Sequence, residues 1–292
     1  MSGKSETPVG IIAQLRGRWP PSLRVQAATE YACRAGYAAR GFVYLSVGLM
    51  ALAAALRFTP RAHGAQGALV EAWAGWAPGP ILLWLTGVGL CFFVLWRLLQ
   101  SVFDADRQGH GLAALGSRAG QALSGLIYGT LAFSVFELVD TLQDLREPDE
   151  MAATRATVAQ ALALPFGPQL VIAAGGFVMA AGVGNIIQAA LRRFDRRLDC
   201  VEGISRWASM LGRWGYLARG LTFLPAGALM IKAGLHARAA EATGLGGALE
   251  ILKAQPFGHL VLGLVGAGLV AFGVFAFAEA RYRRMGALEP TA

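Results

Sequence analysis

Residues 34–44 read RAGYAARGFVY, and the pattern returns at 118–128 as RAGQALSGLIY and at 213–223 as RWGYLARGLTF. All three stretches have Arg at the first position, Gly at the third and eighth, and Tyr or Phe at the last. The copies begin 84 and 95 residues apart, at positions 34, 118 and 213. A spacing that repeats at long period predicts duplicated structural units. No catalytic motif accompanies the repeat, so the sequence says more about architecture than about activity.

The composition indicates a membrane protein. Of 292 residues, 55% are hydrophobic and only 15% are charged, whereas a soluble domain has about 25% charged residues. Six runs of 12 or more residues contain no Asp, Glu, Lys or Arg: 41–56, 72–96, 119–136, 156–191, 220–231 and 254–278. A membrane-spanning helix needs about 20 mainly apolar residues. We therefore predict six spans, of which the fifth has the shortest apolar run.

The basic residues lie mainly on one predicted side of the membrane. The segments 1–40, 97–118, 192–219 and 279–292 together hold 19 of the 26 Lys and Arg residues. The positive-inside rule then puts both termini in the cytoplasm, which requires an even number of spans. Topology and anionic headgroups explain the net charge of +8, and we expect no nucleic-acid partner.

The even-numbered spans and the connectors repeat as well. Pro165-Phe-Gly167 matches Pro256-Phe-Gly258, and this register separates equivalent positions by 88 and 91 residues. Two sets of equivalent residues are Gly87, Gly175 and Gly266, and Gln100, Gln188 and Glu279. Before each even span, the residues 66–73, 156–162 and 245–252 mix apolar and polar positions at helical spacing, which predicts a short amphipathic helix at the outer surface.

These observations predict an all-α integral membrane protein. Its six transmembrane helices form three tandem helical-hairpin repeats in a pseudo-threefold arrangement, with short amphipathic connector helices on the outer side. The expected divisions are a basic cytoplasmic segment 1–30, repeat 1 at 31–104, repeat 2 at 115–192 and repeat 3 at 210–284. Together the three repeats make a single membrane domain.

The motifs carry a family resemblance. The R-x-G-Y-x-A-R-G pattern, the amphipathic connector, Gln255-Pro-Phe-Gly258 and Ala280-Arg-Tyr-Arg283 resemble the bacterial membrane family called domain of unknown function 1206. That resemblance covers about residues 30–284 and implies three tandem two-helix repeats in a bacterial cytoplasmic membrane. It implies no activity. The middle repeat departs from the pattern, with Gln121 in place of Tyr and Ser124 in place of Arg.

Glycines spaced one heptad apart predict where the helices pack closely. Lipid tails are as apolar as Leu, so helices in a bilayer associate through close backbone packing rather than hydrophobic burial. The chain has 38 glycines. The pairs that form thin stripes are Gly41 with Gly48, Gly175 with Gly182, and Gly266 with Gly273.

Arg40 and Arg219 are the candidate functional residues. Lys232 follows Arg219 by 13 positions, or roughly 20 Å of helix, which is less than the roughly 30 Å hydrocarbon thickness. Such an arginine either snorkels to the headgroups or meets a partner at the same depth, and the expected partners are Glu279, Gln100 and Gln188. The third interpretation is an anion or lipid-headgroup site in which the residues Arg40, Arg219, Tyr44, Ser124 and Tyr128 converge at the pseudo-threefold centre.

Three function classes follow. The first is a non-enzymatic scaffold or accessory subunit of a membrane assembly. An alternative is binding or transport of an anion or lipid headgroup through Arg40 and Arg219, and a second alternative is an enzyme acting on lipid. The cysteines Cys33, Cys91 and Cys200 have no metal-ligand spacing, so we expect no metal site and no cofactor. The expected partners are membrane lipids, including anionic ones, and other membrane proteins or further copies of the chain.

Overall fold

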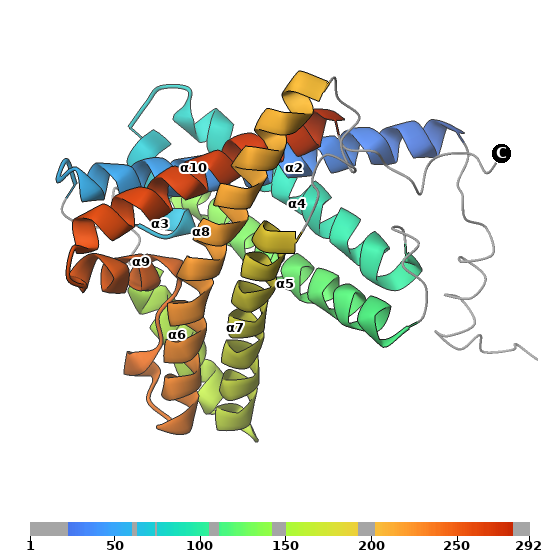
Figure 1. Cartoon of the computed structure of the whole chain (residues 1–292). Coiled ribbons are helices and arrows are strands. Elements are labelled where there is room, and N and C mark those ends of the chain that lie inside the picture. The colour runs from blue at the N-terminus through green and yellow to red at the C-terminus, as the bar shows by residue number, and fades with distance from the viewer. Residues whose placement is uncertain are drawn as a thin grey trace, which may run out of the picture.

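The computed structural model describes residues 23–59, 63–73, 75–104, 111–141, 150–191 and 202–282, and every regular element in these ranges is helical. The six long helices are α2 (Leu23–Ala55), α4 (Gly79–Phe103), α5 (Leu112–Thr141), α7 (Gly167–Leu191), α8 (Glu202–Leu235) and α10 (Gly258–Tyr282). The short helices that connect them are α3 (Ala65–Trp73), α6 (Glu150–Leu162), the 3-10 turn η3 (Ala239–Glu241) and α9 (Leu245–Ala254). A connector helix thus precedes each of α4, α7 and α10, as the sequence predicts (Figure 1).

Five of the described helices are long and apolar enough to cross a membrane. They include the segments Glu30–Ala55 in α2, Gly79–Phe103, Ala114–Glu137 in α5, Gly167–Leu191 and Gly258–Tyr282. The long helix outside this group is α8, which has 34 residues but carries Arg219 and Lys232 within its apolar part. Length therefore permits six spans, whereas apolar composition alone identifies five.

The long helices pack in a regular order. The most extensive contacts join α4 to α5, α7 to α8, and α10 to α2, so that each even span packs against the odd span of the next repeat. The pair α10–α2 joins the third repeat to the first. In Figure 1, the α7–α8 pair runs steeply across the direction of the α2–α10 pair. Within a repeat, α2 packs against α4 and α8 against α10, but α5 and α7 are not among the packed pairs of described helices.

Glycine backbones meet at two of these three interfaces. A Cβ added to Gly41 would lie 2.9 Å from the carbonyl oxygen of Gly273, and one added to Gly48 would lie 2.8 Å from that of Gly266. Gly182 and Gly175 on α7 oppose two glycines of α8 in the same way. Built Cβ atoms on those two residues of α8, Gly220 and Gly227, would each lie 2.8 Å from the facing carbonyl oxygen. No larger residue fits these positions without moving a helix backbone.

The α4–α5 interface is a looser copy of the same arrangement. Val94 occupies the position equivalent to Gly182 and Gly273, and Ala132 the position equivalent to Gly48 and Gly227. A Cβ on Gly125 would lie 3.9 Å from the Val94 carbonyl oxygen, which is ordinary contact. Replacement of two glycines by larger residues thus explains the wider approach of this pair.

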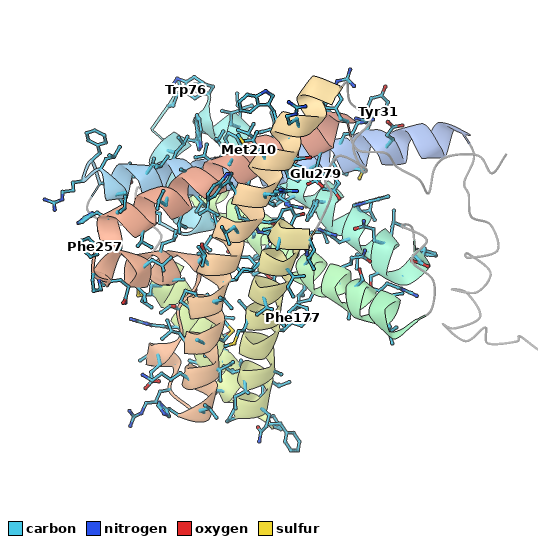
Figure 2. The ribbon with its side chains drawn as sticks, viewed as in Figure 1. Tyr31, Trp76, Phe177, Met210, Phe257 and Glu279 are labelled. Carbon is cyan, nitrogen blue, oxygen red and sulfur yellow. The ribbon has the colours of Figure 1, made fainter. Side chains whose placement is uncertain are left out.

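The middle repeat also lacks the small residues that close the other two hairpins. A Cβ on Gly89 would lie 2.6 Å from the Cβ of Ala39, and one on Gly268 would lie 2.5 Å from the Cβ of Ala218. The equivalent residues of α7 and α5 are Phe177 and Leu123, and the Phe177 side chain can be located in Figure 2. Two large side chains in place of Gly and Ala prevent the same close approach, so α5 and α7 stand apart.

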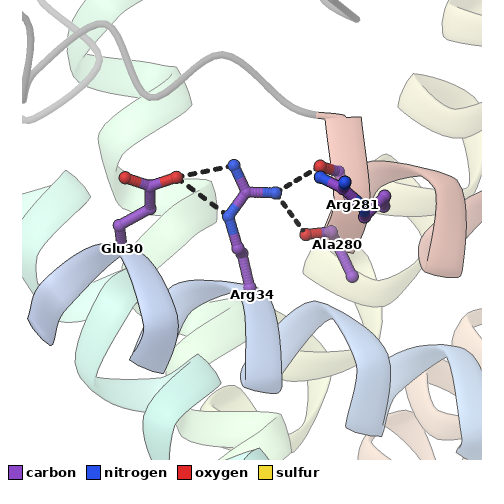
Figure 3. A network of polar contacts seen from close by, with 4 residues as sticks. All are labelled: Glu30, Arg34, Ala280 and Arg281. Carbon is purple, nitrogen blue, oxygen red and sulfur yellow. Dashed lines mark hydrogen bonds and ion pairs between the residues drawn. The ribbon is translucent and has the colours of Figure 1, made fainter. Parts of the chain in front are cut away.

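In repeats 1 and 2, the first arginine of the motif holds the end of the even span that packs against its own helix. The guanidinium of Arg34 donates to the carbonyl oxygens of Ala280 and Arg281 at the end of α10, and it also pairs with Glu30 at 2.6 Å (Figure 3). Arg118 donates in the same way to the carbonyl oxygens of Ser101 at 2.6 Å and Val102 at 3.1 Å. The last carbonyls of a helix lack intrahelical partners and carry partial negative charge, which a guanidinium satisfies.

The connector α3 is fastened to α2 through an aromatic side chain. The indole nitrogen of Trp73 donates to the Ser46 hydroxyl at 2.8 Å, and that hydroxyl donates to the Phe42 carbonyl oxygen at 2.9 Å. The Trp73 ring also packs on the Phe42 ring, with centroids 5.0 Å apart. Leu69 of α3 and Leu249 of α9 are fully buried, so both connectors pack against the long helices along one face.

Candidate functional site

The guanidinium groups of two arginines lie close to the same aromatic ring, where α2, α8 and α10 meet. The guanidinium carbons of Arg40 and Arg219 each lie 4.6 Å from the centre of the Phe272 ring. A second ring also lies close to each guanidinium: Phe93 at 5.5 Å from Arg40, and Tyr44 at 4.9 Å from Arg219. Contacts of this kind stabilise a cation by about 0.5–2 kcal/mol each. They provide no hydrogen-bond acceptor for the N–H groups.

Arg40 is buried with donor groups unused. Only 3% of the surface of Arg40 is exposed. Within the part of the chain that the structure describes, its Nε and Nη2 atoms have no hydrogen-bond partner, and neither has Nε of Arg219. Leaving a buried charged donor without an acceptor costs more than the 1–3 kcal/mol of a neutral one. The described residues therefore leave these donor atoms of the two arginines unsatisfied.

The last positions of the repeated motif converge beside these arginines. Tyr44 and Tyr128 occupy equivalent positions in repeats 1 and 2, and the Tyr128 hydroxyl donates to the Tyr44 hydroxyl at 3.2 Å. Phe223 is the equivalent residue of repeat 3, and its ring lies 5.1 Å from the Arg219 guanidinium carbon. The structure thus brings Arg40, Arg219, Tyr44 and Tyr128 together in one cluster.

The local sequence explains why the rings can approach so closely. Gly36 and Gly215, the third residue of the motif, lie against the backbones of Phe93 and Phe272, where an added Cβ would come within 2.8 Å of the neighbouring Cα. The next motif residue, a tyrosine, then packs edge-on against the same ring. The ring centroids are 5.5 Å apart for Tyr37 with Phe93 and 5.2 Å apart for Tyr216 with Phe272.

Among the expected charge partners, Glu279 acts on the cluster. It is buried near the C-terminal end of α10, where Figure 2 labels it, and its carboxylate attracts the Arg40 guanidinium. Gln100 is buried on α4 and accepts a hydrogen bond from Arg97 at 3.1 Å. Gln188 on α7 is half-buried.

The comparisons with known proteins agree with this repeat structure. The family model described as Domain of Unknown Function (DUF1206) matches residues 35–104, 119–192 and 214–283. The chain belongs to this family. It is 28% identical over 261 residues to "Uncharacterized protein YxxB" of Bacillus subtilis (strain 168), which covers 86% of this chain and 90% of the relative. No solved structure matches at a significant level.

The three family matches confirm the resemblance and the three-repeat architecture that the motifs predict. The three matches also let equivalent residues of the repeats be compared. Ser124 takes the place of Arg40 and Arg219 in the second match, and it is half-buried on α5. At this motif position repeats 1 and 3 therefore have a guanidinium, and repeat 2 has a hydroxyl.

Three members of the cluster were not among the predicted site residues: Arg97, Phe93 and Phe272. The guanidinium of Arg97 lies 4.9 Å from the Phe93 ring centre, which adds a third cation to the aromatic group. Phe93 and Phe272 are equivalent residues of α4 and α10 and lie six residues after Gly87 and Gly266. That shared position in the predicted register is the signal that could have identified them.

The arrangement suits binding rather than acid–base chemistry. Its titratable members are three arginines, tyrosines and one carboxylate, and arginine stays protonated in proteins. In the ranges that the structure describes, no group of three or more His, Cys, Asp or Glu side chains is placed to hold a metal ion. A phosphate or carboxylate would supply the acceptors that the guanidinium groups lack.

Proposed function

We propose that this DUF1206 protein is a six-span protein of the bacterial cytoplasmic membrane that binds a phosphate or carboxylate group at Arg40 and Arg219. Both termini lie in the cytoplasm. The three repeats surround the site in a pseudo-threefold arrangement, which is interrupted in the middle repeat because α5 and α7 stand apart. The protein is a binding protein and not an enzyme. Membrane lipids with anionic headgroups and free anions share the chemistry that the site recognises.

The observation that carries this proposal is that two buried donor atoms of Arg40, Nε and Nη2, have no hydrogen-bond partner among the described residues, while a second guanidinium lies at the same Phe272 ring. Two like charges in a low-dielectric site repel unless an anion lies between them. Glu279 attracts Arg40, but one carboxylate carries a single negative charge and cannot neutralise both Arg40 and Arg219. The remaining positive charge favours an external anion.

Membrane insertion of α8 supports the same site. A charged side chain within the bilayer normally faces the protein interior or a polar cavity. Arg219 does so, because its guanidinium lies among Tyr44, Phe223 and Phe272. Inward placement of this charge lets α8 act as the sixth span. The cyclic order of contacts, from each even span to the next odd one, supports the pseudo-threefold order.

The alternative function is a scaffold in which Glu279 and the aromatic rings hold the arginines permanently. The glycine-lined interfaces α7–α8 and α10–α2 favour it, because they show tight packing of the kind a rigid subunit needs. A scaffold and a binding protein differ in one measurable property, which is the effect of the arginines on ligand affinity.

The test measures binding of inorganic phosphate and of phosphatidylglycerol to the purified protein. Calorimetry reports the first and native mass spectrometry the second, for wild type, Arg40→Gln and Arg219→Gln. Arg213→Gln is the matched control, because Arg213 lies on α8 six residues from Arg219 and is exposed. Size-exclusion profiles and thermal unfolding establish that each variant is folded.

A hydrogen bond between charged groups contributes roughly 1.5–3 kcal/mol, so each site variant should weaken anion binding by about tenfold to a hundredfold. The Arg213→Gln protein should bind like wild type. If folded Arg40→Gln and Arg219→Gln proteins retain wild-type affinity for both ligands, the binding function is wrong and the scaffold remains.

A further inference from the structure

We infer that the gap between α5 and α7 is a lateral opening through which a membrane phospholipid with an anionic headgroup reaches Arg40 and Arg219. This inference rests on the proposed function and names its ligand. The acyl chain lies against the facing sides of α5 and α7, and the headgroup phosphate lies at the guanidinium groups.

The first observation is open space on both facing sides. Gly36 and Gly215 are so close to α4 and α10 that a Cβ would collide with backbone atoms. A Cβ built at Gly120, the equivalent residue of α5, meets nothing within 4 Å, and the same is true of Gly184 on α7. The contact that closes hairpins 1 and 3 is therefore missing in hairpin 2.

The second observation is the loss of aromatic side chains from one face of α7. The equivalent residues of α4 and α10 are Phe93 and Trp96, and Phe272 and Phe275, all of them buried at the centre. In α7 these two positions are Ala181 and Gly184, and both are half-buried. The middle repeat thus lacks the two large rings that the other repeats have at these positions.

The third observation is an apolar residue of α5 that this opening exposes. Ile127 is 48% exposed, whereas its equivalents Val43 and Thr222 are only 2% and 0% exposed. Leu123 and Phe177 lie at the same facing positions and are half-buried. The walls of the opening are therefore hydrocarbon, which suits an acyl chain and not a hydrated ion.

Charge complementarity decides the headgroup. Tyr128 of α5 lies beside the arginine cluster: its hydroxyl donates to Tyr44, and its ring packs on Phe93 with centroids 4.8 Å apart. Ser124 stands one turn before it, at the position where the other repeats have an arginine. An amphiphile whose chain lies along α5 would thus place its phosphate beside Arg40 and Arg219, with the shorter Ser124 side chain leaving room for it.

The experiment closes the opening without changing any charge. Ala181→Phe/Gly184→Phe introduces on α7 the two rings that α10 has at equivalent positions. Gly176→Phe adds a ring to the same helix at the position equivalent to the exposed Ala267, and it serves as the control. Each protein is titrated with nanodiscs containing phosphatidylglycerol and, separately, with inorganic phosphate.

A second measurement uses the wild-type protein alone. A phosphatidylglycerol carrying a photoreactive diazirine on its acyl chain is crosslinked in the nanodisc, and the labelled peptides are identified by mass spectrometry. The inference expects labelling at residues 120–127 and 177–184, with a matched phosphatidylcholine probe labelling them at least fivefold less.

The closing variant, Ala181→Phe/Gly184→Phe, should bind phosphatidylglycerol at least tenfold more weakly than wild type and bind phosphate within twofold of wild type. Gly176→Phe should bind both ligands like wild type. Unchanged lipid affinity in the folded closing variant would overturn the opening, while Arg40→Gln could still show that the anion site is real. If the closing variant does not fold, crosslinks confined to other helices would overturn the inference. If Arg40→Gln and Arg219→Gln bind phosphate and phosphatidylglycerol as tightly as wild type does, the proposed anion-binding function is wrong as well.

Discussion

Replacement of Gly48 by alanine should loosen the contact between the first and last repeats. A Cβ at this position would lie 2.5 Å from the backbone nitrogen of Val270 and 2.8 Å from the carbonyl oxygen of Gly266. Ordinary contact begins at 3.4 Å, so α2 and α10 must separate locally by about 0.9 Å. Both neighbouring atoms belong to the backbone of α10, and no side-chain rotation can relieve the overlap.

The expected cost follows from two opposing effects. Overpacking of this kind destabilises a folded protein by about 1–3 kcal/mol. Alanine regains about 0.8–1 kcal/mol through its better helix propensity. Relative to wild type the net loss is then about 0–2 kcal/mol, a fall in melting temperature of up to roughly 8 °C. Relative to a control that keeps the propensity gain without the overlap, the loss stays at about 1–3 kcal/mol. Larger side chains have no such compensation, so Gly41→Leu and Gly266→Leu should reduce the yield of folded protein in detergent.

Gly176→Ala on α7 is the matched control. It makes the same chemical change in a long apolar helix, but a Cβ there meets nothing within 4 Å. Only the propensity effect remains, and the control should be neutral or slightly more stable than wild type. Thermal unfolding of the three proteins, followed by intrinsic fluorescence in one detergent, measures the difference.

The reasoning would be refuted if Gly48→Ala and Gly176→Ala melt at the same temperature. Equal stability would mean that α2 and α10 adjust at no cost, and the glycine stripes would then have no role in packing. Unchanged folded yield of both leucine variants would lead to the same conclusion.

Three further outcomes can be measured. Trp73→Phe keeps the ring but loses the bond to Ser46, so it should cost about 1 kcal/mol and speed hydrogen exchange in α3. Arg34→Gln removes the donors to the last carbonyls of α10 and should speed exchange at residues 279–282, whereas wild-type rates there would contradict the capping role. The hydrogen bond from His236 lowers the pKa of Glu241 below its ordinary 4.5. Its contribution to stability is therefore present above about pH 4.5 and lost as the pH falls further, and His236→Gln should flatten this acid limb of the melting curve.

The architecture was largely predictable from the sequence because the repeat acts through short-range rules. Charge-free runs predict spans, Pro-Phe-Gly marks the start of two of the three even spans, and the motif arginines of repeats 1 and 2 lie where a helix end needs donors. The count of spans was harder. Arg219 interrupts the apolar pattern of α8, and only the surrounding rings explain how that charge could be accommodated.

Part of the site could also be predicted. Equal spacing brought Arg40, Arg219, Tyr44 and Tyr128 to one depth, and the structure groups them. Phe272 was missed because a phenylalanine in an apolar span carries no signal of its own, and its role depends on two helices that meet from different repeats. The open hairpin was missed because its cause is a change of size at Leu123 and Phe177, which polarity patterns do not report.

The middle repeat connects packing to function. A fully symmetric trimer of hairpins would place aromatic rings from α4, α7 and α10 at the centre, and the arginines would be sealed there without access. Ala181 and Gly184 remove those rings from α7, while Phe177 keeps α5 at a distance. Larger side chains at one level of hairpin 2 and smaller ones at the next do not improve its packing, and their combination agrees with the lipid path to Arg40 that we infer. A converse change supplies the test of this argument: Leu123→Ala/Phe177→Gly should let hairpin 2 close, raise the melting temperature and weaken binding of phosphatidylglycerol, whereas a destabilised protein with unchanged lipid binding would show that α5 and α7 are held apart for another reason.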